Sequence, residues 1–109
     1  MQIADVERLK LKAKFFRGFA DPTRLAILEL LRDGEVQATD IAARLNQSPS
    51  NISNHLSCLM DCGLVQSRRE GRTIHYSIRL DKVREILEDA DEALKQVYDE
   101  ISACVKYNE

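Results

Sequence analysis

Apolar residues recur every three or four positions through most of this chain, and that spacing predicts amphipathic helices. The first run lies in residues 1–20, where basic side chains fill many of the intervening positions. We expect this segment to form one helix with its charged side in solvent. Its apolar stripe consists of Val6, Leu9, Ala13, Phe16 and Ala20.

Two shorter helices are expected next. Asp21 and Pro22 suit a helix cap and first turn, so the second helix should begin there and end at Asp33-Gly34. A short third helix should start at Thr39. The buried positions predicted from spacing are Leu25, Leu28 and Leu31, with Ile27 and Leu30 alongside, followed by Ile41, Ala42 and Leu45.

The most informative segment is a helix expected over residues 48–63. Asn46-Gln47 is a tight turn, Ser48 is a favourable cap before Pro49, and Gly63 suits a left-handed helix end. At about 100° per residue the helix has an apolar face, a small polar uncharged face and a face with two cysteines. These faces comprise Ile52, Leu56 and Leu59, then Ser50, Ser53, Asn54 and Ser57, and then Cys58 and Cys62 beside His55 and Asn51.

In residues 64–78 the apolar positions recur every second residue, which predicts a β-hairpin that turns near Gly71. Arg68, Arg69 and Arg72 crowd its tip. A short helix, a turn and a helix with a polar exposed face form the helix-turn-helix pattern. A basic hairpin directly after it is expected to act as a wing.

From Asp81 the chain is expected to be helical, with apolar residues at a 3.5-residue period. So long a seam has no obvious partner in a small domain, so we interpret it as a dimer interface completed by the first helix. The alternative is packing within the chain. The seam consists of Val83, Leu87, Ala90, Leu94, Val97, Ile101 and Cys104.

The expected fold is therefore mainly α with a β-hairpin, a winged helix-turn-helix in one domain over residues 1–109. Residues 39–63 form the helix-turn-helix, residues 64–79 form the wing, and residues 1–20 and 81–105 form the dimerisation helices. With 109 residues and 44% apolar content, the chain supports one modest core.

Composition narrows the functional classes. The chain has no run of 18 apolar residues and no secretory signal pattern, so we expect a cytoplasmic protein without a membrane span. It lacks the nucleophile, phosphate-loop and zinc-protease motifs, and we expect no enzyme. The net charge is −2, but residues 41–80 carry five arginines against two acidic residues. Arginine suits phosphate and base-edge contacts, so double-stranded DNA is the expected partner.

A two-fold dimer would place two recognition helices about 34 Å apart and read an inverted repeat. Ser50, Ser53, Asn54 and Ser57 can donate and accept at base edges, while Arg68, Arg69 and Arg72 would reach flanking phosphates.

The chain has three cysteines, and two of them are four residues apart. Side chains at i and i+4 are about 5–6 Å apart at Cβ, close enough to share a metal but awkward for a disulfide. Cys104 of the partner subunit could complete an all-thiolate site with Cys58 and Cys62, although a lone cysteine in a seam also fits a core position. His55 is interpreted as a packing or orienting residue, and His75 as ordinary surface.

Three motifs together resemble the ArsR/SmtB family of winged-helix metalloregulators. They are FADPTRLAILELL, SNISNHLSCLMDCGLV and EGRTIHYSI, and the resemblance covers nearly the whole chain. It implies a homodimer joined through its first and last helices and a repressor that releases operator DNA when inducer binds. The cysteine placement resembles that of CmtR-type cadmium and lead sensors, which implies Cys58, Cys62 and Cys104 as ligands.

Some metal sites of the family are missing here. The third helix has no cysteine, and the last helix has no histidine. The expected function is thus a repressor induced by Cd(II) or Pb(II), with Zn(II) as a weaker ligand. Alternatives are a thiol-redox, reactive-sulfur or arsenite-type sensor of the same fold, or a metal-sequestering or protein-interaction module without DNA function.

Overall fold

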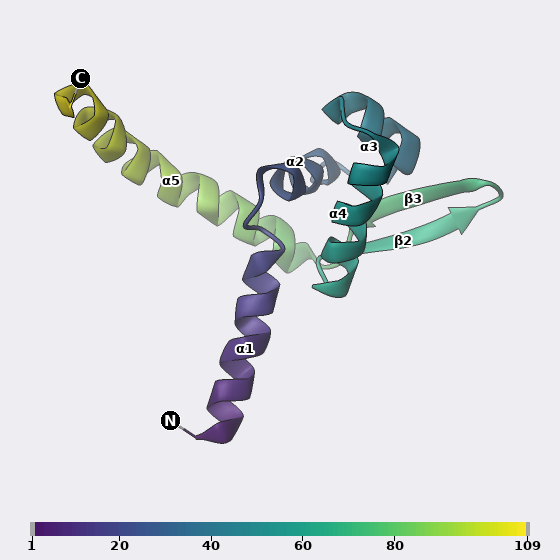
Figure 1. Ribbon diagram of the computed structural model, residues 1–109, viewed down its shortest axis with the longest axis horizontal. Helices are drawn as coiled ribbons and strands as arrows, with labels where there is room; N and C mark the ends of the chain where they lie inside the picture. Colours follow the sequence, from purple (N-terminus) through teal and green to yellow (C-terminus); the bar gives the residue numbers. More distant parts are fainter. Residues whose placement is uncertain (1, 109) are drawn as a thin grey trace.

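The computed structural model describes residues 2–108, with side chains described through Glu100. Figure 1 shows α2, α3 and α4 gathered into one body, with the β2–β3 hairpin projecting from it and α1 and α5 extending away from the hairpin. The expected fold, mainly α with a hairpin, is confirmed. The helices are α1 (Ile3–Arg17), α2 (Pro22–Leu31), α3 (Ala38–Leu45), α4 (Pro49–Asp61) and α5 (Asp81–Asn108), and the strands are β1 (Val36–Gln37), β2 (Val65–Glu70) and β3 (Thr73–Ile78).

One apolar core joins α2, α3, α4, the sheet and the first turns of α5. The expected inward face of α4 is confirmed, since Ile52, Leu56 and Leu59 are all buried. Leu25 was expected to be buried but is 38% exposed, whereas Ile27, which was expected alongside the buried face, is fully buried. The reason is that α2 packs against α3, α4 and β3 together, which turns its buried side toward Ile27, Leu28 and Leu31.

The caps of α2 and α4 lie where the sequence places them. The Asp21 carboxylate accepts the backbone N–H of Arg24 at 3.0 Å, and the Ser48 hydroxyl accepts that of Asn51 at 3.1 Å. Asn46 ends α3 in the left-handed conformation at φ 53°, which an asparagine tolerates. Asn46 and Ser48 therefore delimit the turn between α3 and α4, and Asp21 fixes the start of α2.

The end of α4 is a Schellman motif. The Leu64 N–H donates to the Leu59 carbonyl at 3.0 Å, and the Gly63 N–H donates to the Met60 carbonyl at 3.0 Å. Gly63 has φ +79°, a region where a side chain would be strained. This motif redirects the chain from the recognition helix straight into the wing.

The wing is an antiparallel hairpin in which Glu70 pairs with Thr73 across a two-residue turn. Gly71 has φ +61°, as the first central residue of a type II′ turn requires. The two-residue strand β1, which we did not expect, pairs with β3 through Val36 opposite Tyr76. The strand order β1-β3-β2 therefore ties the wing to the loop that follows α2.

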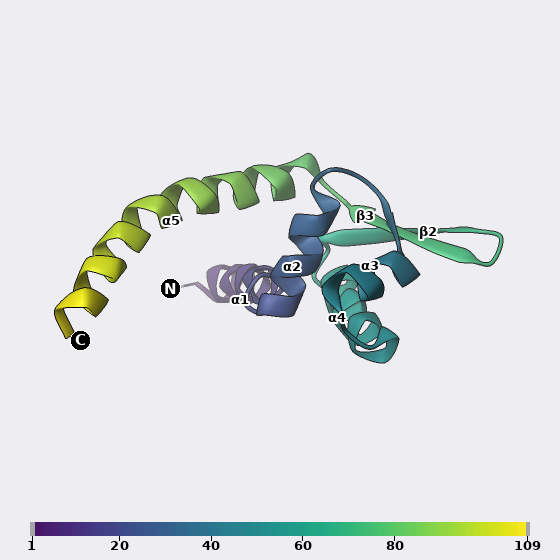
Figure 2. The same cartoon turned by 90° about the horizontal axis from the view of Figure 1, so that it is seen from above.

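The two long helices, α1 and α5, differ in how many of their apolar residues are buried. Val83 and Leu87 of α5 are buried in the core, whereas Leu94 and Val97 further along are 56% and 45% exposed. None of the residues of α1 is buried, and its predicted stripe is open to solvent. Figure 2 shows α5 curving away from the body. Ile101 and Cys104 lie beyond the residues whose side chains the structure describes.

Within residues 2–108, no helix combines the length and the apolar character that crossing a bilayer would need.

Candidate nucleic-acid interface and thiol pair

The polar face of α4 is accessible. Ser50, Ser53, Asn54 and Ser57 are all exposed, and the opposite side of the same helix is buried. Short side chains with hydroxyl and amide groups let a helix approach base edges closely and offer both donors and acceptors. The helix thus presents a surface suited to a major groove.

Gln47 positions the turn, a role that the sequence pattern did not reveal. Its side-chain amide donates to the Thr23 hydroxyl of α2 at 3.1 Å, and its carbonyl accepts from the Asn51 side chain. Gln47 therefore connects the turn to both α2 and α4. The contact with Thr23 spans 24 residues and carries no local sequence signal.

The predicted wing arginines differ in their surroundings. Arg69 and Arg72 are exposed on the hairpin. The guanidinium of Arg68 instead binds the Glu35 carboxylate through two bonds of 2.8 and 2.6 Å, and it reaches Glu70 at 3.0 Å. The structure therefore leaves two of these three cations available for a phosphate.

His75 was expected to be ordinary surface, and the structure corrects this. Its side chain is 21% exposed, and its Nδ1 lies 3.6 Å from the Glu35 carboxylate. Its Nε2 lies 3.0 Å from the Thr73 hydroxyl. The loop that carries Glu35 packs beside β3, so His75 is enclosed by charged groups from two segments.

Cys58 and Cys62 are free, half-buried thiols one turn apart, Cys58 on α4 and Cys62 at its C-cap. Burial raises the pKa of the Cys62 thiol, and the charge and hydrogen bond of neighbouring Cys58 raise this pKa further. The nearby cations of Lys14 and Arg24 act in the opposite direction. A pair of thiols whose negative charges repel each other is a donor set that a soft cation would stabilise.

The described side chains supply only these two thiols. No group of three His, Cys, Asp or Glu side chains that could hold a metal occurs among the residues the structure describes. The predicted third ligand, Cys104, lies on the last turns of α5 beyond the described side chains. A three-thiolate site therefore stays a prediction.

Cys62 packs directly against the end of α1. A Cβ added to Gly18 would lie 3.4 Å from the Cys62 Cβ and only 2.5 Å from Cδ1 of the fully buried Leu64. Arg24 secures this junction by donating to the Gly18 carbonyl at 3.2 Å and to the Arg17 carbonyl at 2.7 Å. The thiol pair is thus in contact, through Cys62, with the end of α1, a helix whose apolar stripe is exposed.

Gly18→Ala is expected to destabilise the protein by about 1–3 kcal/mol through overpacking. The backbone at Gly18 has φ −59°, so alanine would otherwise be tolerated and would add about 0.4–1 kcal/mol of stability. Urea unfolding at fixed protein concentration measures whether the free energy of unfolding falls or rises. A stabilised variant would show that the contact with Leu64 relaxes without cost.

His55 faces the start of α2. Its Nδ1 lies 3.8 Å from the Asp21 carboxylate, and its side chain is 20% exposed. The pKa of Asp21 is lowered chiefly by the backbone N–H of Arg24, with smaller contributions from the charges of His55 and Arg24. His55 therefore sits between α4 and the α2 cap, as expected of an orienting residue.

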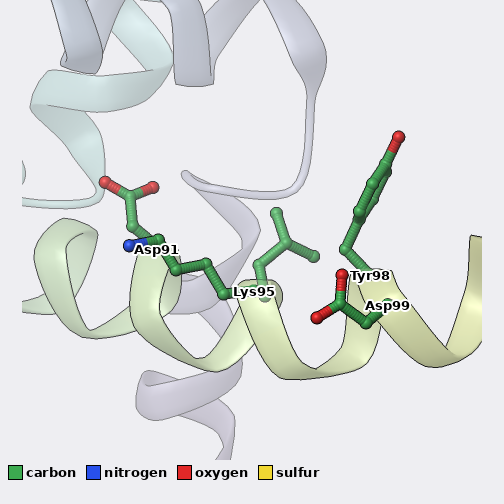
Figure 3. A pocket seen from close by; sticks show the side chains of 5 residues that line it. Asp91, Lys95, Tyr98 and Asp99 are labelled. Atoms are coloured by element: carbon green, nitrogen blue, oxygen red, sulfur yellow. The ribbon is translucent and has the colours of Figure 1, made fainter.

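A hollow of about 350 Å³ runs along the distal part of α5. Its five lining residues all belong to this one helix, as Figure 3 shows. No second element of the described chain forms an opposite wall. The lining residues are Asp91, Leu94, Lys95, Tyr98 and Asp99.

Known proteins resemble this chain in both sequence and structure. Residues 21–67 match the model of the bacterial regulatory protein, arsR family. A probable mercury resistance operon repressor from Streptomyces lividans is 40% identical over 75 residues, which cover 69% of this chain and 60% of that protein. The transcriptional regulator CmtR from Mycobacterium tuberculosis is 48% identical over 66 residues, covering 61% of this chain and 56% of CmtR. The chain thus spans less than two thirds of the length of these curated relatives.

Two solved structures are similar over longer stretches. One is the homodimeric winged helix-turn-helix DNA-binding domain of a possible ArsR-family regulator from Mycobacterium bovis. It is 30% identical with a TM-score of 0.78, and the match covers 88% of this chain and 93% of that one. The other is the cadmium sensor CmtR from Mycobacterium tuberculosis, 43% identical with a TM-score of 0.61, with 71% and 80% covered.

Proposed function

The chain belongs to the arsR family of bacterial regulatory proteins, and on that premise we propose a metal-responsive repressor. It would bind operator DNA as a cytoplasmic homodimer and release it when a soft metal ion occupies its thiols. The observation that carries the proposal is the arrangement of α4, which carries both the exposed polar face and Cys58 and ends at Cys62.

Dimerisation would use the distal half of α5 together with α1. Val6 and Leu9 of α1 and Leu94, Val97 and Tyr98 of α5 are all exposed large apolar residues. Apolar surface that one chain leaves in water is a common feature of an interface between subunits. The similarity to a homodimeric winged helix-turn-helix domain supports the same conclusion.

DNA contact would divide between helix and wing. Ser50, Ser53, Asn54 and Ser57 would read base edges in the major groove, with the Asn54 amide suited to adenine. Arg69 and Arg72 would bind phosphates next to the groove. In a two-fold dimer, the two recognition helices would meet half-sites about 34 Å apart in an inverted repeat.

The metal site would combine Cys58 and Cys62 with Cys104 of the partner subunit. The donor set fits a soft cation, since both described ligands are free, half-buried thiols at i and i+4. Cd(II) is the first candidate because a cadmium sensor is among the structural relatives, with Pb(II) second and Zn(II) as a weaker ligand.

Hg(II) is an alternative inducer. Two thiolates satisfy this ion, and Cys58 and Cys62 could supply both. The mercury operon repressor is a relative of similar identity. In that case the metal would need no ligand from α5.

The coupling would be short in range. A bound metal would hold the thiolates in one coordination shell. Cys62 lies against Gly18, where α1 ends, and Cys104 is carried by α5, so ligation would connect the recognition helix to both dimer helices. The angle between α4 and the dimer axis would change, and with it the spacing of the two recognition helices.

An anaerobic titration of the reduced protein with Cd(II), followed by ultraviolet thiolate-to-metal charge transfer, tests the site. We expect a band that saturates at one Cd(II) per protomer and is weakened by both Cys58→Ser and Cys104→Ser. Hg(II) binding that survives Cys104→Ser while Cd(II) binding is lost would favour the two-thiol alternative. The absence of any stoichiometric band would overturn the metal site and leave thiol oxidation as the trigger.

A further inference from the structure

A charged cluster at the base of the wing joins segments that are far apart in the sequence. Glu35 lies in the loop between α2 and β1, and Arg68 lies on β2, 33 residues later. The two side chains form a fork in which Arg68 Nε and Nη2 donate to the two Glu35 oxygens at 2.8 and 2.6 Å. Bidentate pairs of this kind are the strongest class of surface ion pair.

Two further groups complete the cluster. Arg68 Nη1 donates to Glu70 at 3.0 Å, so a second carboxylate occupies the remaining side of the guanidinium. His75, directly across the ladder from Arg68, lies 3.6 Å from Glu35 and 3.9 Å from Glu70. With His75 neutral, two carboxylates and one guanidinium leave the cluster with a net charge of −1.

The other wing arginines lack this arrangement. Arg69 follows Arg68 on the strand and points to the opposite face of the hairpin, because side chains alternate along a strand. Arg72 occupies the turn and is exposed. Within the described residues, no carboxylate is paired with either side chain. A phosphate near the hairpin therefore meets two unpaired cations and one that is already neutralised.

We propose that Glu35 holds Arg68 away from DNA, so that this carboxylate sets how strongly the wing binds the phosphate backbone. The inference rests on the proposed DNA-binding function. A phosphate could take the two-donor edge of the Arg68 guanidinium only by displacing both arms of the fork, and at the remaining donors it would approach two negative charges. Arg68 is thus a masked cation, and Glu35 determines affinity without touching the nucleic acid.

The test is the salt dependence of binding to a labelled 30-base-pair duplex, measured by fluorescence anisotropy between 50 and 200 mM salt. Each phosphate contact contributes about −0.9 to the slope of log K against log salt. Glu35→Gln keeps the shape of the side chain and frees Arg68, so a dimer with two wings should gain about −1.8 in slope. Binding should be tighter at 50 mM salt, and it should fall about 12-fold more than wild type over this range.

Two control variants separate the fork from a general charge effect. Glu29→Gln removes the same charge from a carboxylate that binds Arg32 at 2.8 Å on α2, and it should leave the slope unchanged. Combining Glu35→Gln with Arg68→Gln should return the slope to the wild-type value. Circular dichroism melting curves confirm that each variant is folded.

Two results would overturn the masking role. Arg68→Gln alone could flatten the slope, which would show that Arg68 contacts phosphate despite its carboxylates. Glu35→Gln could weaken binding at an unchanged slope, which would show that Glu35 merely holds the wing in place. If the wild-type chain fails to bind the duplex even at 50 mM salt, the DNA function itself is wrong.

Discussion

Val97→Glu is expected to dissociate the proposed dimer and, with it, to abolish tight DNA binding. Val97 is 45% exposed on the distal half of α5, next to Leu94 on the same apolar stripe. Each side chain of this size contributes about 1.5–3 kcal/mol when it is buried. A two-fold interface contains the position twice, so at least about 3 kcal/mol is lost, and the dimer dissociation constant should rise by about 100-fold or more.

The consequence for DNA follows from geometry. A dimer places two recognition helices on one face of the duplex, whereas a monomer has one. The second helix binds at a high effective concentration, and this advantage disappears on dissociation. Analytical ultracentrifugation should show the monomer, and anisotropy with a duplex should show weakened binding at the same protein concentration.

Gln96→Glu is the matched control. It introduces the same charge one residue away, at an exposed position about 100° around α5 from Val97. We expect this variant to stay dimeric. A Val97→Glu protein that still sediments as a dimer would show that the exposed stripe of α5 is not the interface.

Local patterns predicted the fold well because local chemistry determines it. The cap at Ser48, the left-handed residue at Asn46 and the Schellman ending at Gly63 each depend on residues within a few positions. These features set the two ends of α4. The 3.6-residue spacing of its apolar residues then indicates which side of the helix is buried. The polar face and the thiol pair of α4 could therefore be placed from the sequence alone.

Features that depend on contacts between distant segments could not be placed in this way. The fork between Glu35 and Arg68 spans 33 residues, and its arginine looks like any other cation in a basic run. His75 was misjudged for the same reason, since the group that encloses it is Glu35. Strand β1 has only two residues, too few for a periodic signal.

The exposure of Leu25, which was expected to be buried, illustrates a limit of helical periodicity. A helix that packs on one neighbour has one stripe, and spacing identifies it. Helix α2 contacts α3, α4 and β3, so its buried side is broader and rotated toward Ile27. Both Leu25 and Ile27 are apolar, so the sequence pattern does not decide which of the two side chains is more deeply buried. The positions of the neighbouring elements decide it.

Cys58→Ser is expected to bind operator DNA as the wild type does but to lose all release by metal. The Cys58 side chain is half-buried on the cysteine face of α4, which borders the polar face that would meet bases, and serine is close to cysteine in size. An allosteric coupling of about 1–3 kcal/mol corresponds to a 5- to 150-fold loss of DNA affinity on metal binding. With one of its ligands absent, this coupling should fall to zero. Anisotropy of the DNA complex, with and without one equivalent of Cd(II), measures it.

The adjacent residue provides the reciprocal variant. Ser57 is exposed on the polar face, so Ser57→Ala should weaken DNA binding by about 1 kcal/mol in each subunit, which is roughly 30-fold for the dimer, and leave Cd(II) stoichiometry and release intact. Opposite phenotypes at these two neighbouring positions would show that DNA recognition and metal sensing use different side chains of α4. If Cys58→Ser loses DNA binding as well, the thiol is a structural part of α4, and the trigger must lie elsewhere in the dimer.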